Sequence, residues 1–354
     1  MAKILSAMSG GVDSSVATKL LLDEGHEVTG VTLDLFCISD TETPVKNAKA
    51  VCDRLGIEHR VYNAHSAFFE RVISPFVETY LAGETPNPCV VCNRRIKFGI
   101  LVDYALEQGF DAVATGHYAR LDRDDESGRY RLLKGLDPVK DQSYVLYSLS
   151  QNQLAHARFP LGSLDKATVR RIAVENGFAS AKAKESQDIC FIPDGDYQGF
   201  IDRAAPGKVR PGPYLSVDGE QIGTHQGVTR YTIGQRRGIG VGFGKPMYVV
   251  AKDAVNNTVT LGENNDLLSG GLIANEVNFI PFDTPREPLP VAAKIRYNQK
   301  EQPAVVRMLP DGSVEVLFDK PQRAVAPGQS VVFYRDELVV GGGIIRRAIP
   351  VDRS

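Results

Sequence analysis

Residues 3–15 read Lys3-Ile4-Leu5-Ser6-Ala7-Met8-Ser9-Gly10-Gly11-Val12-Asp13-Ser14-Ser15, and the fold class can be inferred from this stretch. Its first half is the apolar run of a short buried strand, and the apolar spacing over 16–23 predicts a helix. Two adjacent glycines between them let the backbone close on an anion, while the helix offers unpaired N–H groups and the positive end of its dipole. In an open α/β sheet, ligands bind at junctions of this kind.

The loop from Ser9 to Ser14 matches neither of two common nucleotide-binding patterns. No Lys follows the glycines as in a Walker A loop, and the spacing is not the G-x-G-x-x-G of a dinucleotide fold. A tight turn followed by a capped helix would also use two glycines and a Ser or Asp. Its place after the first strand favours phosphate binding over that simpler explanation.

Strands and helices alternate through the first 200 residues. Runs rich in β-branched residues predict strands at 28–36, 57–62 and 111–117, and helices are expected over 45–55, 67–81 and 95–108. Such alternation predicts an α/β fold, with a parallel sheet covered by helices on both faces.

Beyond residue 200 the helical periodicity ends and prolines and glycines cluster over 206–213. Turn signals separate short strand-like runs at 246–252, 258–261, 304–308, 314–318, 330–334 and 338–340. We therefore expect a catalytic domain over 1–200, a small central β-rich module over 201–270 and a C-terminal β-barrel module over 271–354. A loose joint is expected near 265–275.

Composition limits the class of protein. The 354 residues are 43% hydrophobic and 24% charged, as in soluble globular proteins of two or three domains. No apolar run is long enough to span a membrane, and five cysteines in so long a chain favour the reducing cytoplasm over a disulfide scaffold. Residues 201–250 hold seven Lys or Arg against three Asp or Glu, which permits binding of a polyanion.

A second informative stretch is Thr85-Pro86-Asn87-Pro88-Cys89-Val90-Val91-Cys92-Asn93, followed by Arg94-Arg95-Ile96-Lys97-Phe98. Two prolines disfavour helical backbone around Asn87, so a stiff, extended loop carrying two thiols is expected. The three cations behind the thiols can favour thiolate over thiol. Two cysteines at this spacing could share a metal ion, a disulfide or a reaction.

These stretches resemble a known family. Ser9-Gly10-Gly11-Val12-Asp13-Ser14 resembles the pyrophosphate loop of the N-type ATP pyrophosphatases (the PP-loop superfamily). Within it, residues 85–88, 92–93 and 96–98 are similar to those of the tRNA-specific 2-thiouridylases. Further similar segments lie at 114–119, 140–144, 185–192, 227–238 and 296–297. The resemblance implies a cytoplasmic sulfurtransferase that uses ATP and Mg²⁺ to adenylate the C2 oxygen of the wobble uridine of tRNA. Sulfur then replaces that oxygen, and AMP and pyrophosphate are released.

The resemblance also implies roles for individual residues. Cys92 would be the nucleophile, Cys190 the persulfide carrier, and Asp13 would lie near Mg²⁺ and the phosphates. ATP would be held by Ala7, Met8, Ser9, Gly10, Gly11, Val12, Asp13, Ser14, Leu33 and Gly116. The target base would face Asn87, Pro88 and Cys89, and tRNA would contact His117, Lys140, Asp141, Gln142, Arg296, Tyr297 and Gln329.

Cys89 departs from the family pattern, in which an Asp commonly follows Asn-Pro. With Cys92 and Cys190 it resembles related tRNA-thiolating enzymes, in which three thiolates hold a 4Fe–4S cluster with one open iron. Zinc is disfavoured because a structural site needs four ligands and there is no second C-x-x-C. Two sulfur routes therefore stay open, a cluster-bound sulfide and a Cys190 persulfide. Sulfur would come from a donor or persulfide relay protein.

Two other functions remain alternatives. Another PP-loop synthetase, such as an argininosuccinate or GMP synthetase type, would adenylate its substrate without needing a thiol pair. A tRNA-binding protein without catalytic activity would use the basic β-rich half alone.

Overall fold

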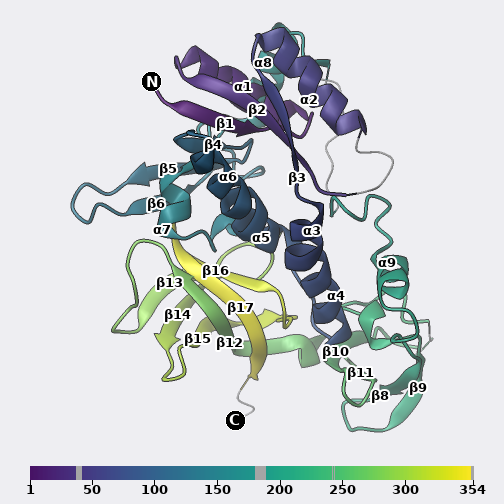
Figure 1. Cartoon of the computed structure of the whole chain (residues 1–354). Helices are drawn as coiled ribbons and strands as arrows, with labels where there is room; N and C mark the ends of the chain where they lie inside the picture. Colours follow the sequence, from purple (N-terminus) through teal and green to yellow (C-terminus); the bar gives the residue numbers. More distant parts are fainter. Residues whose placement is uncertain (37–41, 180–188, 241, 243, 352–354) are drawn as a thin grey trace.

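The computed structural model describes residues 1–36, 42–179, 189–240, 242 and 244–351, and Figure 1 shows how its parts are arranged. The α/β half contains a five-stranded sheet with the order β3-β2-β1-β4-β7, and all its neighbouring strands are parallel. The strands are β1 (Lys3–Ala7), β2 (Glu27–Asp34), β3 (His59–Asn63), β4 (Ala112–Ala114) and β7 (Ala157–Arg158). The predicted α/β class with a parallel sheet is therefore confirmed.

Helices cover both faces of this sheet. On one face α1 (Val12–Asp23), α2 (Glu42–Leu55) and α8 (Lys166–Glu175) enclose an apolar cluster that includes Val16, Val51 and Val169. On the other face α6 (Leu101–Glu107) packs against β4, and its Leu101 and Val102 are buried with Leu5. Because both faces are covered, the ends of the strands are the part of the sheet left open for a ligand.

Two long helical segments contain stretches of π-helix. One runs through α3 (His65–Phe68), η1 (Phe69–Ile73) and α4 (Ser74–Leu81). The other runs through α5 (Pro88–Cys92), η2 (Asn93–Ile100) and α6. The expectation of a stiff, extended loop over 85–93 is therefore wrong for its second half, because both thiols of the Cys-Val-Val-Cys stretch lie on α5. Shorter helices are α7 (Gln151–Ala155) and α9 (Tyr197–Ala204).

The second half of the chain forms two β structures, as predicted. A four-stranded sheet, the middle module, comprises β8 (Gly212–Leu215), β9 (Gln221–His225), β10 (Tyr248–Asp253) and β11 (Thr258–Gly262). Six strands follow in the order β12-β15-β14-β13-β16-β17, and pairing of β12 with β17 closes them into a barrel. They are β12 (Leu268–Phe279), β13 (Leu289–Lys294), β14 (Gln302–Met308), β15 (Val314–Arg323), β16 (Ser330–Arg335) and β17 (Leu338–Pro350).

The loose joint expected near 265–275 is not present. A 3₁₀ turn over Asn264–Leu267 leads directly into β12, which pairs with both β15 and β17 along this stretch. Gly270 and Gly271 interrupt the run of apolar residues in this part of the sequence. Strand β12 nevertheless includes them, with a shift in its register against β15. The predicted domain boundaries at residues 200 and 270 stay predictions.

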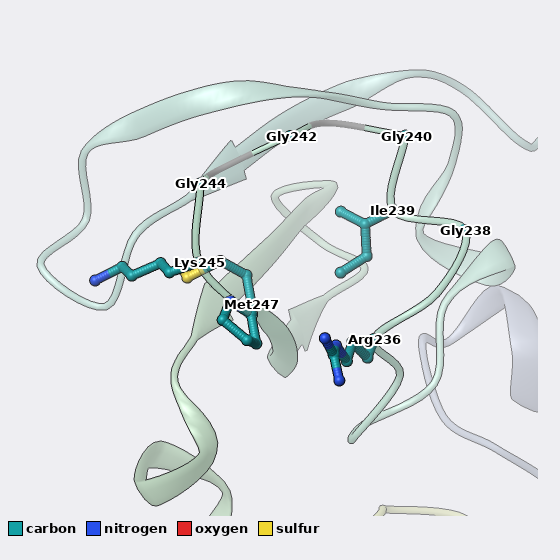
Figure 2. A pocket seen from close by; sticks show the side chains of 9 residues that line it. Arg236, Gly238, Ile239, Gly240, Gly242, Gly244, Lys245 and Met247 are labelled. Atoms are coloured by element: carbon teal, nitrogen blue, oxygen red, sulfur yellow. The ribbon is translucent and has the colours of Figure 1, made fainter.

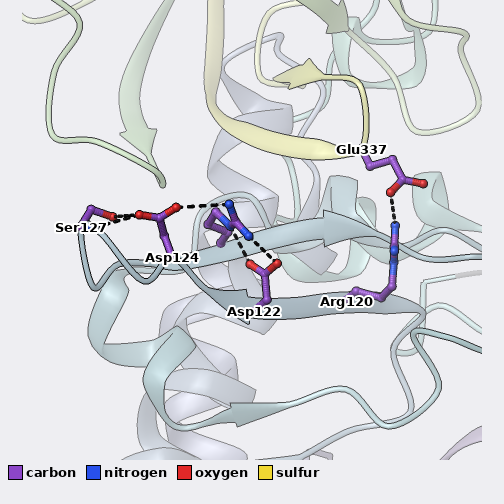
Figure 3. A network of polar contacts seen from close by, with 6 residues as sticks. Arg120, Asp122, Asp124, Ser127 and Glu337 are labelled. Atoms are coloured by element: carbon purple, nitrogen blue, oxygen red, sulfur yellow. Dashed lines mark hydrogen bonds and ion pairs between the residues drawn. The ribbon is translucent and has the colours of Figure 1, made fainter.

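A hairpin of the α/β half joins the barrel. β5 (Ala119–Arg123) pairs with β6 (Tyr130–Lys134), and Leu133 of β6 pairs with Leu338 of β17. Figure 3 shows the polar contacts around this junction, including the Arg120–Glu337 ion pair at 2.8 Å. Close to this pair, Arg131 bridges Asp122 and Asp124, at 2.7 and 3.2 Å. The α/β half and the barrel are therefore joined in one continuous sheet.

A helix that crosses a membrane must be both long and apolar. Across the described residues, no helix is both long enough and apolar enough to cross a membrane.

Candidate active site

The loop between β1 and α1 has the geometry of an anion cradle. Gly10 has a φ of +73°, and a Cβ there would lie 2.7 Å from the Pro44 carbonyl oxygen, so no other residue fits without strain. Gly11 is the N-cap of α1, and no described side chain accepts a hydrogen bond at this cap. The first-turn N–H groups of α1 are thus available to an anion at the positive end of the helix dipole.

Serines hold the shape of this loop. The Ser9 amide donates to Ser14 Oγ at 3.2 Å, and Ser15 Oγ donates to the Gly11 carbonyl oxygen at 2.8 Å. Gly116, just after β4, packs against the start of α1, since a Cβ there would lie 2.8 Å from Ser14 N. Gly10 and Gly116 therefore allow close backbone packing around this loop, and its binding of a nucleotide phosphate chain stays a prediction.

The other residues predicted to bind ATP lie around the same sheet edge. Ala7 ends β1, and half-buried Leu33 lies near the end of the neighbouring strand β2. Met8 is buried, and its sulfur accepts from the Cys52 thiol at 3.2 Å, so its side chain belongs to the core beneath the loop. The structure thus brings these residues together, while their contact with ATP stays a prediction.

Asp13 has two partners that sequence reasoning missed. Lys166 Nζ lies 2.6 and 2.8 Å from its carboxylate oxygens, and the Tyr118 hydroxyl donates to it at 2.8 Å. Lys166 is the first residue of α8, where the helix dipole disfavours a cation. That unfavourable position was the only feature of the sequence that could have indicated a functional role for Lys166.

The two thiols of α5 are positioned by a strong helix-start signal. Asn87 is the N-cap and accepts from the Val90 amide at 3.4 Å, and Pro88 occupies the first helical position. Pro fits that position because its φ is already helical and no N–H is needed there. The helix buries Cys92 in an apolar cluster and leaves Cys89 exposed.

The thiols are less acidic than the neighbouring cations suggested. Desolvation raises the pKa of Cys89, Cys92 and Cys190, the last to about 12, even though Cys89 and Cys190 expose some surface to solvent. Phe191 and Ile192, next to Cys190 in the sequence, are buried in the same apolar cluster as Cys92, so Cys190 lies near the thiols of α5, and Cys92 and Cys89 also raise its pKa. Of the three cations, only Lys97 lowers these pKa values, and it does not outweigh desolvation.

The three thiols do not form the arrangement expected for a cluster. Among the residues that the structure describes, no group of three or more His, Cys, Asp or Glu side chains is placed to hold a metal ion. The donor set is chemically suitable, but its arrangement does not fit a three-thiolate site. Residues 185–188 of the segment that resembles the family around Cys190 lie outside the described residues.

His117 lies beneath the site rather than on the surface. Its Nδ1 is 2.7 Å from Thr115 Oγ1, and its ring contacts Phe98 and Phe159. Desolvation, aided by Lys97, holds the pKa of His117 well below its usual value. With only 8% of its surface exposed, its predicted contact with tRNA stays a prediction.

Four other residues expected to touch tRNA meet at one turn beside the site. Asp141 Oδ1 accepts from the Gly135 and Ser143 amides, and Gln142 Oε1 accepts from the Tyr118 amide. The Tyr297 hydroxyl, from the barrel, donates to the Asp141 carbonyl oxygen at 3.0 Å. Lys140 lies in the same turn, where its amide donates to the Asp137 carbonyl oxygen.

The last two predicted tRNA contacts join parts of the protein to each other. Arg296 donates to the carbonyl oxygens of Ile233 and Ala324, both at 2.9 Å, and so joins the middle module to the barrel. The Gln329 side chain donates to the backbone just before α5.

Basic residues also line a pocket of about 430 Å³ in the middle module (Figure 2). Arg236 and Lys245 lie on either side of a glycine-rich loop, together with Ile239 and Met247. Arg236 belongs to the segment 227–238 that resembles the family.

Three family models match successive parts of the chain. They are described as a tRNA methyl transferase HUP domain over residues 2–194, a tRNA methyl transferase PRC-barrel domain over 198–263 and an aminomethyltransferase beta-barrel domain over 269–345. Each coincides with one of the three parts seen in the structure.

Similar proteins cover almost the whole chain. The tRNA-specific 2-thiouridylase MnmA of Acetivibrio thermocellus is 47% identical over 97% of this chain and 99% of its own length. That of Carboxydothermus hydrogenoformans is 46% identical, with 98% of both chains covered. Among solved structures, the U34-tRNA thiolase NcsA of Methanococcus maripaludis, with its [4Fe-4S] cluster, is 18% identical over 58% of this chain and 67% of its own. The TM-score of that comparison is 0.35. The two relatives, together with the three matched domains, show that this chain belongs to the family of tRNA-specific 2-thiouridylases, which are tRNA sulfurtransferases.

Proposed function

We propose that the protein thiolates C2 of the wobble uridine of tRNA at the expense of ATP, in the cytoplasm. One observation carries the proposal. The same α/β half holds an anion cradle at the start of α1 and two thiols far apart in the sequence, Cys92 and Cys190, which come near each other because Cys92 and the neighbours of Cys190 share one apolar cluster.

The first step activates the uracil. The C2 oxygen is a poor leaving group, so it attacks the α-phosphate of ATP, and the bond to pyrophosphate breaks. The α1 N-terminus would stabilise the departing pyrophosphate. Asp13 would hold Mg²⁺, which neutralises phosphate charge, and Lys166 would then turn from Asp13 to the phosphates.

The second step delivers sulfur. The terminal sulfur of a Cys190 persulfide attacks C2, and AMP leaves with the former C2 oxygen. The Cys92 thiolate then attacks the Cys190 sulfur, which breaks the S–S bond and releases 2-thiouridine. A Cys92–Cys190 disulfide remains, and an external thiol reduces it. A sulfur donor or relay protein would reload Cys190.

Cysteine variants test this proposal. Cys92→Ser and Cys190→Ser should abolish 2-thiouridine formation, measured by mass spectrometry of digested tRNA, whereas Cys52→Ser should retain it because Cys52 lies in the core away from the thiols. Thiolation by either single variant would contradict the proposal, and activity of both in adenylating another substrate would point to a synthetase.

Iron and sulfide analysis after anaerobic purification separates the two sulfur routes. The persulfide route predicts an iron-free protein that thiolates tRNA from a persulfide donor. Stoichiometric iron that is lost together with activity would instead establish the cluster route.

A further inference from the structure

A tight turn of the barrel lies against the backbone that leads into α5. It consists of Ala326-Pro327-Gly328-Gln329, just before β16, and we call it the clamp turn. The Gln329 amide donates to the Ala326 carbonyl oxygen at 3.3 Å, and Gly328 has a φ of +85°. Pro at the second position and Gly with positive φ at the third indicate a type II turn.

Three hydrogen bonds join the clamp turn to Thr85 and Pro86. The Thr85 amide donates to the Pro327 carbonyl oxygen at 2.8 Å. Gln329 Nε2 donates to the carbonyl oxygens of Thr85 and Pro86, at 2.9 and 3.2 Å. The two backbones are also in contact, because a Cβ on Gly328 would lie 2.9 Å from both Thr85 N and Thr85 O.

The segment before α5 needs partners of this kind. Pro86 and Pro88 have no N–H group, so residues 85–88 cannot form a regular ladder with another strand. The Thr85 and Pro86 residues are half-buried, and unpaired carbonyl groups there would be destabilising. Both N–H groups of a single Gln329 amide satisfy these two carbonyls.

The other end of α5 is connected to the same part of the barrel. Asn93 Nδ2 donates to the Val145 carbonyl oxygen at 3.0 Å. On either side of Val145, the hydroxyl of Tyr144 donates to the Ser330 carbonyl oxygen at 2.7 Å, and that of Tyr147 lies 3.2 Å from Ser330 Oγ. Ser330 directly follows Gln329, so the start of β16 supports α5 from both ends.

We propose that Gln329 is a positioning residue, which fixes the Thr85-Pro86 backbone and so sets where α5 holds Cys89 and Cys92. The barrel would thereby take part in the geometry of sulfur transfer as well as in binding tRNA. This inference rests on the proposed thiolation, and it assigns Gln329 a role different from the tRNA contact that the family resemblance implies.

Gln329→Met tests the inference, because Met has a similar length and shape but no N–H groups. Gln322→Met is the matched control, since Gln322 is another barrel glutamine, more deeply buried than Gln329, that bonds to Lys320 and Gln299, away from α5. Thermal unfolding of both variants shows whether the fold is retained, and the expected loss of stability is similar in the two.

Two measurements distinguish positioning from tRNA contact. Gln329→Met should lower kcat for thiolation at least about tenfold while the Kd for tRNA stays within about twofold, because misplaced reacting groups slow the reaction without weakening binding. Without tRNA, mass spectrometry should also show faster iodoacetamide labelling of buried Cys92 in this variant, but not in Gln322→Met.

A weaker tRNA Kd with unchanged kcat and unchanged labelling would make Gln329 a tRNA contact and overturn the inference. Unchanged kcat, Kd and labelling would overturn it as well. If the wild-type protein thiolates no tRNA, the proposed function fails, but the labelling experiment still decides whether Gln329 positions α5.

Discussion

At the residue scale, Asp13 and Lys166 form a largely covered ion pair beside the loop proposed to bind ATP. The Asp13 carboxylate lies in the first turn of α1, where the helix dipole favours it, and two-thirds of its side chain is covered. Lys166 is more deeply buried, with 11% of its side chain exposed, so it needs an anionic partner. Mg²⁺ bound to Asp13 and phosphate bound to Lys166 would satisfy both groups.

Lys166→Met should therefore raise the KM for ATP. The loss of one charged hydrogen bond to phosphate is expected to cost about 1.5–3 kcal/mol, or about 10- to 100-fold. The measurement is pyrophosphate release at saturating tRNA, with Lys19→Met as the control because Lys19 pairs with Asp23 at the far end of α1. An unchanged KM for ATP would exclude Lys166 from the nucleotide site.

Lys252 gives a prediction about pH. Desolvation lowers its pKa to about 8, and its Nζ donates to the Tyr231 carbonyl oxygen at 2.7 Å. Between pH 8 and 10.5 the unfolded chain binds more protons at Lys252 than the folded protein does. The free energy of unfolding therefore rises with pH in this window relative to Lys252→Met. Chemical denaturation at pH 7, 8, 9 and 10 measures the difference, and a constant or opposite trend would contradict the pKa shift.

At the scale of elements, α5 joins the thiols to the rest of the site. Its five residues are too few for a stable isolated helix, so its geometry depends on the Asn87 cap, on continuation into η2 and on the clamp turn. π-Helical turns such as η2 often occur at functional sites. A small change in these supports would move two thiols at once.

Asn87→Ala should weaken α5 by about 1 kcal/mol, the usual effect of losing an N-cap side chain. Asn87→Asp can still cap the helix, so comparison of the two variants isolates the capping role. Iodoacetamide labelling of Cys92 without tRNA should be faster in Asn87→Ala only. Equal labelling in the two variants would show that the cap does not position α5.

Sequence patterns predicted the α/β class and most strands, because alternating helices and buried strands differ strongly in their apolar spacing. The helix at 88–92 was missed because two prolines were interpreted as extended backbone, although Asn before Pro is also a helix-start signal. The contacts of Lys166 with Asp13 and of Gln329 with Thr85 could not be predicted. They join distant segments, and no local pattern encodes such pairs.

At the scale of the whole molecule, the three parts contact one another around the candidate site. The β5–β6 hairpin extends the barrel sheet through Leu133 and Leu338. Arg296 links the middle module to the barrel, and the clamp turn links the barrel to α5. We expect a polyanion such as tRNA to bind across all three parts.

Arg296→Met tests the joining role of this side chain. Losing its two bonds to Ile233 and Ala324 should lower the free energy of unfolding by about 2 kcal/mol, as expected for bonds from a charged donor. Exposed Arg307, on β14, provides the matched control variant Arg307→Met. A large loss of tRNA affinity without any loss of stability would show that Arg296 acts mainly on tRNA.

The most direct test of the proposed reaction is to measure pyrophosphate and 2-thiouridine together, with purified protein, ATP, Mg²⁺, a persulfide donor and a tRNA that has uridine at the wobble position. The account predicts that pyrophosphate release requires this tRNA and that one pyrophosphate forms for each 2-thiouridine. Pyrophosphate release that does not depend on tRNA, or thiolation without ATP, would contradict it.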